Sequence, residues 1–216
     1  MRFLYGMDNE PMSGLLHFIG LLLAIAGLIL LLLFAAKNGT VWHIVGFSVF
    51  GTTLILLYVT STLYHFFPIT SKAKRVFKRI DHAMIYALIA GTYTPICLVT
   101  LHGVWGWTLF FVIWLVAAAG ISIKSAGVRI PDWFSTVIYV VMGWLAVIAF
   151  VPLRAGLSIT GFLWMYAGGV FYTVGAVIYS FDHVWKNKWF GAHELWHVFV
   201  MAGSFCHFWL MLNYVL

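Results

Sequence analysis

The chain has 216 residues, of which 63% are hydrophobic and only 8% are charged. A soluble domain carries about 25% charged residues, so this chain lacks the polar side chains to cover a globule, and the sequence predicts an integral membrane protein. The net charge of +6 does not indicate a nucleic-acid partner, because the basic residues lie in short loops between apolar segments, where they set membrane orientation. The two cysteines, Cys97 and Cys206, lie in apolar stretches, which excludes a disulfide framework and a CxxC metal site.

Seven apolar segments are long enough to cross the membrane as helices, for which roughly 20 residues are needed. They run over about 14–36, 42–66, 80–101, 104–123, 133–152, 158–180 and 192–214. We therefore expect an all-α protein, a seven-transmembrane helix bundle that forms a single domain over residues 1–216. Ala24-Ile25-Ala26 is similar to a signal-peptide cleavage site, but the apolar run continues to Ala36, so we expect a retained helix. Pro95 is expected to kink the third helix.

Lysine and arginine are distributed unequally between the two sides of the predicted bundle. With the N-terminus inside, the inner segments hold all of these residues except Lys37 and Arg154. Because positively charged loops stay in the cytoplasm, the N-terminus is predicted to be cytoplasmic and the C-terminus to lie outside. We expect a multi-pass protein of the cell membrane.

Polar residues from three predicted spans meet near the cytoplasmic face. Intramembrane ionisable residues are costly and indicate function, and the topology brings His65, Asp81, His193 and His197 to one depth. His193 and His197 are spaced i, i+4, about 6 Å apart along the helix axis, so both imidazoles can bind one ion. His65 could supply a third nitrogen, which gives the geometry of catalytic zinc with one open position.

Two further residues have predicted roles beside this set. Asp81 would hydrogen-bond a metal-bound water or a ligating imidazole. Ser61 lies one turn before His65 on the same face, where it could hold the metal-bound water or polarise a substrate carbonyl. Three imidazoles favour Zn²⁺, because iron and manganese more commonly take a carboxylate ligand.

The other histidines are interpreted as packing or interface residues, or are left open. Those near predicted span boundaries are His17, His43, His102 and His183. His82 faces about 100° away from Asp81 on the same helix and is also expected to pack. His207 lies deeper than His197 and could pair with another polar group there.

Glu194 has two interpretations. With His193 and His197 it completes the pattern H-E-x-x-H, the signature of zinc proteases in which the glutamate is the general base. However, intramembrane proteases of that kind usually add a downstream aspartate in a Leu-Asp-Gly setting, which this chain lacks. An acidic residue in the first turn of a helix is also favoured by the helix dipole. We favour this second, structural interpretation.

The chain resembles a known family in three ordered motifs, which are Ser61-x-x-x-His65, Asp81 followed by Gly91-Thr92-Tyr93-Thr94-Pro95, and His193-x-x-x-His197. This is the hemolysin III family, the bacterial branch of the progestin and adipoQ receptors, in a superfamily that includes alkaline ceramidases. The resemblance implies a bacterial membrane protein with zinc near the cytoplasmic side of a seven-helix bundle. It makes His65, His193 and His197 the ligands, with Asp81 at the zinc-bound water and Ser61 in the same site. Superfamily relatives hydrolyse lipid amides, animal relatives are hormone receptors, and the bacterial branch is associated with haemolysis and pores.

Three functions are therefore open. The first is a zinc-dependent hydrolase of a lipid amide, whose substrate is a membrane lipid that enters between helices. In this function zinc lowers the pKa of its bound water to about 7, Asp81 takes the proton of that water, and Ser61 stabilises the oxyanion. The second is a receptor or sensor in which zinc only links helices. The third is a pore-forming haemolysin, for which the sequence offers few polar residues in the outer half of the membrane. We favour the hydrolase.

Overall fold

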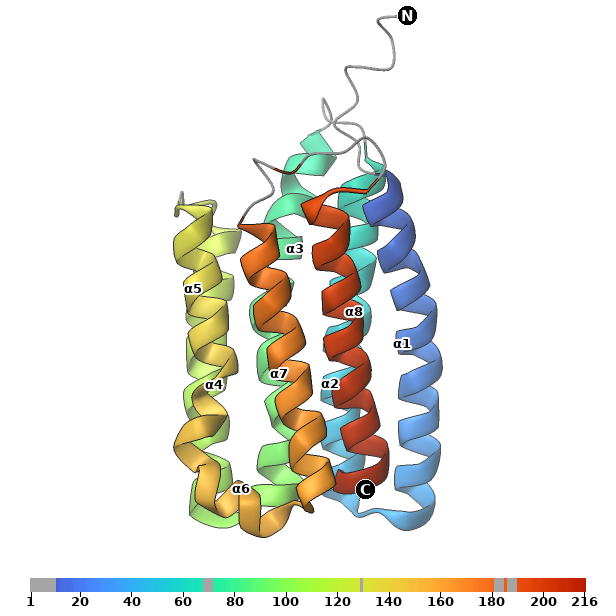
Figure 1. The fold of residues 1–216 in the computed structure, drawn as a ribbon, viewed down its shortest axis with the longest axis vertical. Coiled ribbons are helices and arrows are strands. Elements are labelled where there is room, and N and C mark those ends of the chain that lie inside the picture. Colours follow the sequence, from blue (N-terminus) through green and yellow to red (C-terminus); the bar gives the residue numbers. More distant parts are fainter. Residues whose placement is uncertain (1–10, 68–71, 129, 181–184, 186–189) are drawn as a thin grey trace, which may run out of the picture.

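The computed structural model describes residues 11–67, 72–128, 130–180, 185 and 190–216, and every regular element in these ranges is helical. Within them, seven helical spans are long and apolar enough to cross a membrane. The predicted all-α, seven-span architecture is confirmed. Figure 1 shows the spans side by side, with Pro11, the first described residue, and the C-terminus at opposite ends of the bundle.

Four of the spans are regular α-helices over their whole length. These are α1 (Pro11–Asn38), α2 (Val41–Phe66), α4 (Gly103–Ser125) and α7 (Ile159–Tyr179). The third span is α3 (Lys72–Pro95), which continues as a π-helix, η1 (Ile96–Leu101), and the seventh is α8 (Ala192–Leu210), which ends as a π-helix, η3 (Met211–Val215). The change to a π-helix directly after Pro95 agrees with the irregularity expected there, because proline removes a backbone donor.

The fifth span differs from the continuous helix expected over 133–152. It consists of α5 (Asp132–Gly143), a 3₁₀ segment η2 (Leu145–Ala149) and the short α6 (Phe150–Gly156). The tyrosine of α3 at position 93 accounts for the break. The Tyr93 hydroxyl donates to the Gly143 carbonyl (2.7 Å) and accepts from the Ala146 amide (2.8 Å). Backbone groups that the break releases from the helix are thereby satisfied inside the membrane.

The third span also begins earlier than predicted, at Lys72 instead of residue 80. Its first two turns are rich in lysine and arginine, so hydropathy does not reveal them, yet nothing in Lys72–Arg79 breaks a helix. The helix therefore extends past the apolar part of the span at the inner end of the bundle.

The second and third spans form the centre of the molecule. Buried residues make up 56% and 67% of their most apolar windows, against 28% or less in the first, fourth, fifth and sixth spans. Gly46 allows the close contact between α2 and α3, because a Cβ there would lie 2.8 Å from the Pro95 Cα. Large apolar side chains cover the outside, among them Val104, Leu115 and Val151, which are 83%, 73% and 76% exposed. Such a surface is suited to lipid.

The helices close into a ring around a central space. Along the chain α1 packs on α2, α2 on α3 and α3 on α4, while α8 packs on both α7 and α1. The first half of the fifth span, α5, contacts α3 and α7. Consequently α2, α3, α5, α7 and α8 can all present side chains to one interior cavity.

Candidate metal centre

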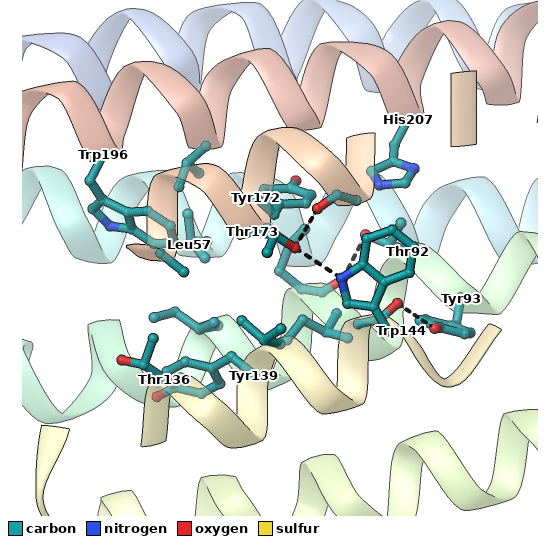
Figure 2. A pocket seen from close by; sticks show the side chains of 18 of the residues that line it. Leu57, Thr92, Tyr93, Thr136, Tyr139, Trp144, Tyr172, Thr173, Trp196 and His207 are labelled. Carbon is teal, nitrogen blue, oxygen red and sulfur yellow. Dashed lines mark hydrogen bonds between the residues drawn. The ribbon is translucent and has the colours of Figure 1, made fainter. Parts of the chain in front are cut away.

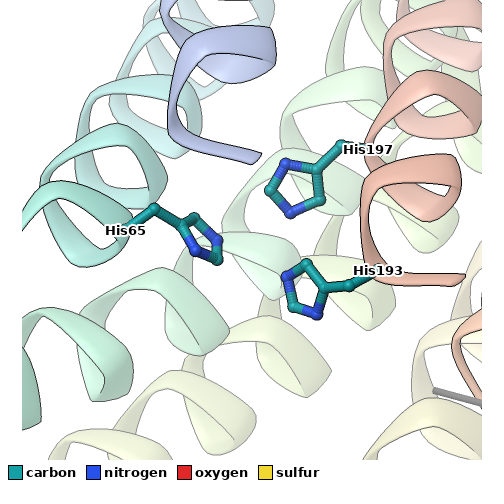
Figure 3. A group of neighbouring side chains, drawn as sticks. All are labelled: His65, His193 and His197. Carbon is teal, nitrogen blue, oxygen red and sulfur yellow. The ribbon is translucent and has the colours of Figure 1, made fainter. Parts of the chain in front are cut away.

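Three histidines from two helices converge at the inner end of the bundle. His65 lies in the last turn of α2, and His193 and His197 lie in the first two turns of α8. One ring nitrogen of each lies within 4.8 Å of the others, and Figure 3 shows the three rings turned toward a common point. His65 and His197 are buried, and His193 is partly exposed.

These three side chains fit a metal ion. Zinc contacts imidazole nitrogens at about 2.0–2.1 Å and accepts three of them plus one open position. Ring nitrogens within 4.8 Å of one another reach these distances by small side-chain rotations. The His197 Nδ1 lies 3.2 Å from the Ser13 carbonyl oxygen, which can only accept, so Nδ1 carries the ring proton. The lone pair of His197 is then on Nε2, the arrangement that a ligating histidine needs.

Asp81 and Ser61, the two residues predicted to act beside the metal, lie together. The Ser61 hydroxyl and the Asp81 carboxylate are close enough to interact electrostatically. Both line the same cavity as His193 and His197, and Ser61 is fully buried one turn before His65 on α2. The structure therefore brings all five predicted site residues to the inner end of the bundle.

His17 is a neighbour of the site that the sequence analysis assigned to packing. Its ring stacks on His197, with centroids 3.7 Å apart and 15° between the planes. Its Nδ1 lies 2.7 Å from the Ser61 hydroxyl. Either the ring nitrogen or the hydroxyl can be the donor in this contact, depending on the tautomer of His17. His17, Ser61 and Asp81 line one cavity beside the three histidines.

A signal for His17 was present in the sequence. The first span starts at the inner end, so His17 lies at nearly the same depth as His65 and His197. Depth alone does not tell which helices are neighbours. The missing information is the contact between α1 and α8, which places His17 against His197.

Glu194 has the structural role that the sequence analysis favoured. Its Oε2 accepts the Gly191 backbone amide at 2.8 Å, so it caps the first turn of α8. Its Oε1 accepts the Ser13 hydroxyl at 2.9 Å. Both carboxylate oxygens are therefore engaged in holding α8 and the start of α1, and Glu194 is not among the residues grouped around the candidate ion.

A large cavity leads from the histidines into the bundle. Its volume is about 460 Å³, and apolar side chains such as Leu57, Ile85 and Ile89 form much of its wall. Figure 2 shows part of its wall, where the Trp144 Nε1 donates to Thr173 Oγ1 at 2.9 Å. His207 also lines this part and stacks on Tyr172, with ring centroids 5.7 Å apart. Among the described residues, no group hydrogen-bonds its buried Nδ1.

The remaining histidines are spread over the molecule. His43 is at the outer end, where its Nδ1 accepts the Thr40 amide (2.9 Å) and its Nε2 contacts the Val215 carbonyl (3.1 Å). His102 precedes α4 with a positive φ of 43°. These two agree with the expected boundary roles. His82 was expected to be a helix-packing residue, but it lines the large cavity. His183 lies outside the described residues.

Comparison with known proteins matches the whole chain to one family. A family model described as "Haemolysin-III related" covers residues 5–208. The "Hemolysin-3 homolog" of Bacillus subtilis (strain 168) is 43% identical, over 98% of this chain and 96% of that protein. "Hemolysin-3" of Bacillus cereus is 42% identical, over 97% of this chain and 93% of that protein. The human "Monocyte to macrophage differentiation factor" is 23% identical, over 81% of this chain and 72% of that protein. The chain is a multi-pass bacterial membrane protein and belongs to the haemolysin-III-related family.

Proposed function

We propose that the protein is a metal-dependent hydrolase of a lipid amide, with zinc held by His65, His193 and His197. The observation that carries the proposal is the position of these three histidines. Their nitrogens lie within 4.8 Å of one another, at the end of a cavity of about 460 Å³ whose wall also holds an aspartate and a serine. A site that only linked helices would need neither the cavity nor these two side chains.

When bound, the ion supplies a Lewis acid that polarises a carbonyl and lowers the pKa of water to about 7. The protein supplies the rest. Asp81 would accept the proton of the attacking water and return it to the leaving amine. Ser61, held by its contact with His17, would donate its proton toward the carbonyl oxygen as negative charge develops on it. The Ser13 carbonyl fixes the orientation and the proton position of His197.

The cavity wall supports a lipid substrate. An acyl chain would lie against Leu57, Ile85 and Ile89, while the amide would lie at the histidines. Burial of apolar surface stabilises such a complex by about 25 cal/mol per Å². The residues around the inner end are polar, so the amide and the chain would each meet a matching part of the same cavity.

Metal analysis of the purified protein tests the first half of the proposal. We expect about one zinc per chain by mass spectrometry, lost in His197→Ala. The control is His102→Asn, at the outer end of the bundle, where asparagine tolerates the positive φ. Wild type that is folded and metal-free, or equal zinc loss in both variants, would overturn the assignment of the ligands.

A fluorescent ceramide tests the second half. Asp81→Asn keeps the shape of the side chain but removes the base, so we expect unchanged zinc and a turnover that falls by about 10²–10⁴. Normal turnover in Asp81→Asn would exclude this role for Asp81. Zinc binding in wild type without hydrolysis of any lipid amide would favour the receptor or sensor, in which the metal only links α2 to α8.

A pore-forming haemolysin is a second candidate, because two Bacillus relatives carry the name hemolysin-3. A conducting pore needs a polar path through the membrane, whereas much of the cavity wall here is apolar. Dye release from vesicles decides between the two. Release by wild type and by Asp81→Asn alike would favour the pore over the hydrolase.

A further inference from the structure

A second pocket lies at the inner rim of the bundle, and its wall carries an excess of positive charge. Its volume is about 320 Å³. The basic side chains that line it are Arg75, Lys78, Arg79 and Lys124, and Asp132 is the acidic residue in its wall. We propose that this pocket binds the phosphate group of an anionic phospholipid.

Helix geometry explains why these cations gather here. Arg75, Lys78, Arg79 and His82 follow the spacing i, i+3, i+4, i+7, so they share one face of α3. This face belongs to the first turns of α3, which extend past the apolar part of the span. Opposite lies the end of α4, which contributes Lys124.

The positions of two cations are set by the fold. Lys124 is only 8% exposed although it lies in the last turn of α4. The Arg79 guanidinium lies over Gly127, where a Cβ would be 2.8 Å from its Cζ. Gly127 has a φ of +70°, a conformation that glycine adopts without strain. The glycine thus makes both the turn after α4 and the space for the guanidinium.

Four basic side chains and one acidic side chain line this pocket. Among the described residues, no ion pair within 4 Å involves Arg75, Lys78, Arg79 or Lys124. The positive-inside bias explains why cations lie on this side of the membrane, but it requires neither a shared pocket nor a buried lysine. Guanidinium and ammonium groups converging on one cavity are the donors that bind phosphate oxygens.

The location favours a lipid over a free phosphate ion. The pocket lies at the inner ends of α3 and α4 and the start of α5. Next to Asp132, Trp133 and Phe134 are 66% and 43% exposed, so aromatic surface suited to the membrane interface borders the pocket. Basic pockets between helices on the cytoplasmic side are typical sites for anionic lipid headgroups.

The pocket is connected to the candidate metal centre through its wall. Lys78, His82 and Asp132 line both this pocket and the large cavity. A headgroup bound here would therefore lie beside the entrance of the site. The proposal does not depend on the metal or on hydrolysis, since it uses residues outside the three-histidine cluster.

Native mass spectrometry of the protein as purified tests the proposal, with phosphatidylglycerol and phosphatidylcholine offered in equal amounts. We expect about one phosphatidylglycerol to be retained in preference to phosphatidylcholine. Arg75→Gln/Arg79→Gln removes two exposed cations from the pocket and should lower this occupancy on the order of tenfold. Lys72→Gln/Lys74→Gln is the matched control, because it removes two charges from the same helix outside the pocket.

Three results would contradict the proposal. Equal retention of the two lipids would exclude a site for anionic headgroups. Equal loss in both double variants would show that only the general surface charge matters. The third result combines two observations. Inorganic phosphate stabilises the protein against heat more than chloride does at matched ionic strength, and Arg75→Gln/Arg79→Gln abolishes this effect. If the protein then shows no preference for phosphatidylglycerol, the pocket binds a free ion.

Discussion

His17 contacts Ser61, and it is not one of the three histidines of the candidate metal centre. It touches the site in two ways, by stacking on His197 and through Nδ1 to the Ser61 hydroxyl. Substitutions can remove one contact at a time. Phenylalanine keeps a flat ring of similar size for stacking, whereas asparagine has an amide group that can replace Nδ1 as a hydrogen-bonding partner of Ser61.

We expect His17→Phe to retain zinc and to lower kcat about tenfold, with KM little changed. The reason is that the hydrogen bond to Ser61 is lost, whereas the apolar wall of the cavity is intact. Asparagine at the same position should restore part of kcat. Steady-state kinetics on a fluorescent ceramide, with zinc measured in each variant, checks this prediction. Loss of zinc in His17→Phe would instead make His17 a part of the metal site.

Substitution of Glu194 can decide between the two interpretations of the H-E-x-x-H pattern, a general base or a structural residue at the start of α8. Its two oxygens hold the Gly191 amide and the Ser13 hydroxyl, so it stabilises the junction of α1 and α8. Glu194→Ala should lower the free energy of unfolding by about 1.5–3 kcal/mol, because hydrogen bonds to a charged group are lost. Turnover per folded molecule should persist.

Thermal unfolding in detergent, followed by tryptophan fluorescence, measures the first effect, and the ceramide assay measures the second. Glu194→Gln is the milder companion, since it keeps an oxygen to accept the Gly191 amide. If Glu194→Gln is as stable as wild type but inactive, the glutamate is a general base and its structural interpretation is wrong.

At the scale of elements, the broken fifth span shows the limit of hydropathy. A window average over 133–152 is high whether or not the helix is continuous, because Leu145–Ala149 is as apolar as its surroundings. The cause of the break lies in another helix, where Tyr93 holds Gly143 and Ala146. Residues distant in sequence decide this feature, so a reading of local pattern does not reveal it.

Tyr93→Phe tests whether the tyrosine hydroxyl maintains the break. Loss of this group leaves the Gly143 carbonyl and the Ala146 amide without their partner, which should cost roughly 1–3 kcal/mol of stability. The control is Tyr166→Phe, which removes a hydroxyl from a 51% exposed tyrosine. A lower melting temperature for Tyr93→Phe alone is expected, and equal melting of the two variants would contradict the role of the hydroxyl.

At the scale of the whole molecule, the sequence predicts the number of spans, their order and the end at which the polar residues gather. These features follow from lengths of apolar segments and from depth, both of which are local properties. The sequence does not predict which helices are neighbours. Depth and the i, i+4 spacing of His193 and His197 predict the group formed with His65 and Asp81. The position of His17 and the two pockets depend instead on how α1, α3, α4 and α8 pack.

The ring of helices gives a metal ion a structural effect as well as a chemical one. In sequence order, α1 packs on α2, α2 on α3 and α3 on α4, while α8 packs on α7 and on α1. An ion held by His65, His193 and His197 would add a connection between α2 and α8 across the ring. Binding to the folded state alone stabilises it by RT ln(1 + [L]/Kd), about 2.7 kcal/mol at a hundredfold excess over Kd.

A chelator should therefore lower the melting temperature of the wild-type protein, and added zinc should restore it. In His197→Ala, which keeps two of the three ligands, the melting temperature should already be lower and should respond little to either reagent. His102→Asn controls for the loss of a histidine at the outer end of the bundle and should behave like wild type. A chelator effect of the same size in His197→Ala would mean that the stabilising ion binds elsewhere, and the link between α2 and α8 would be wrong.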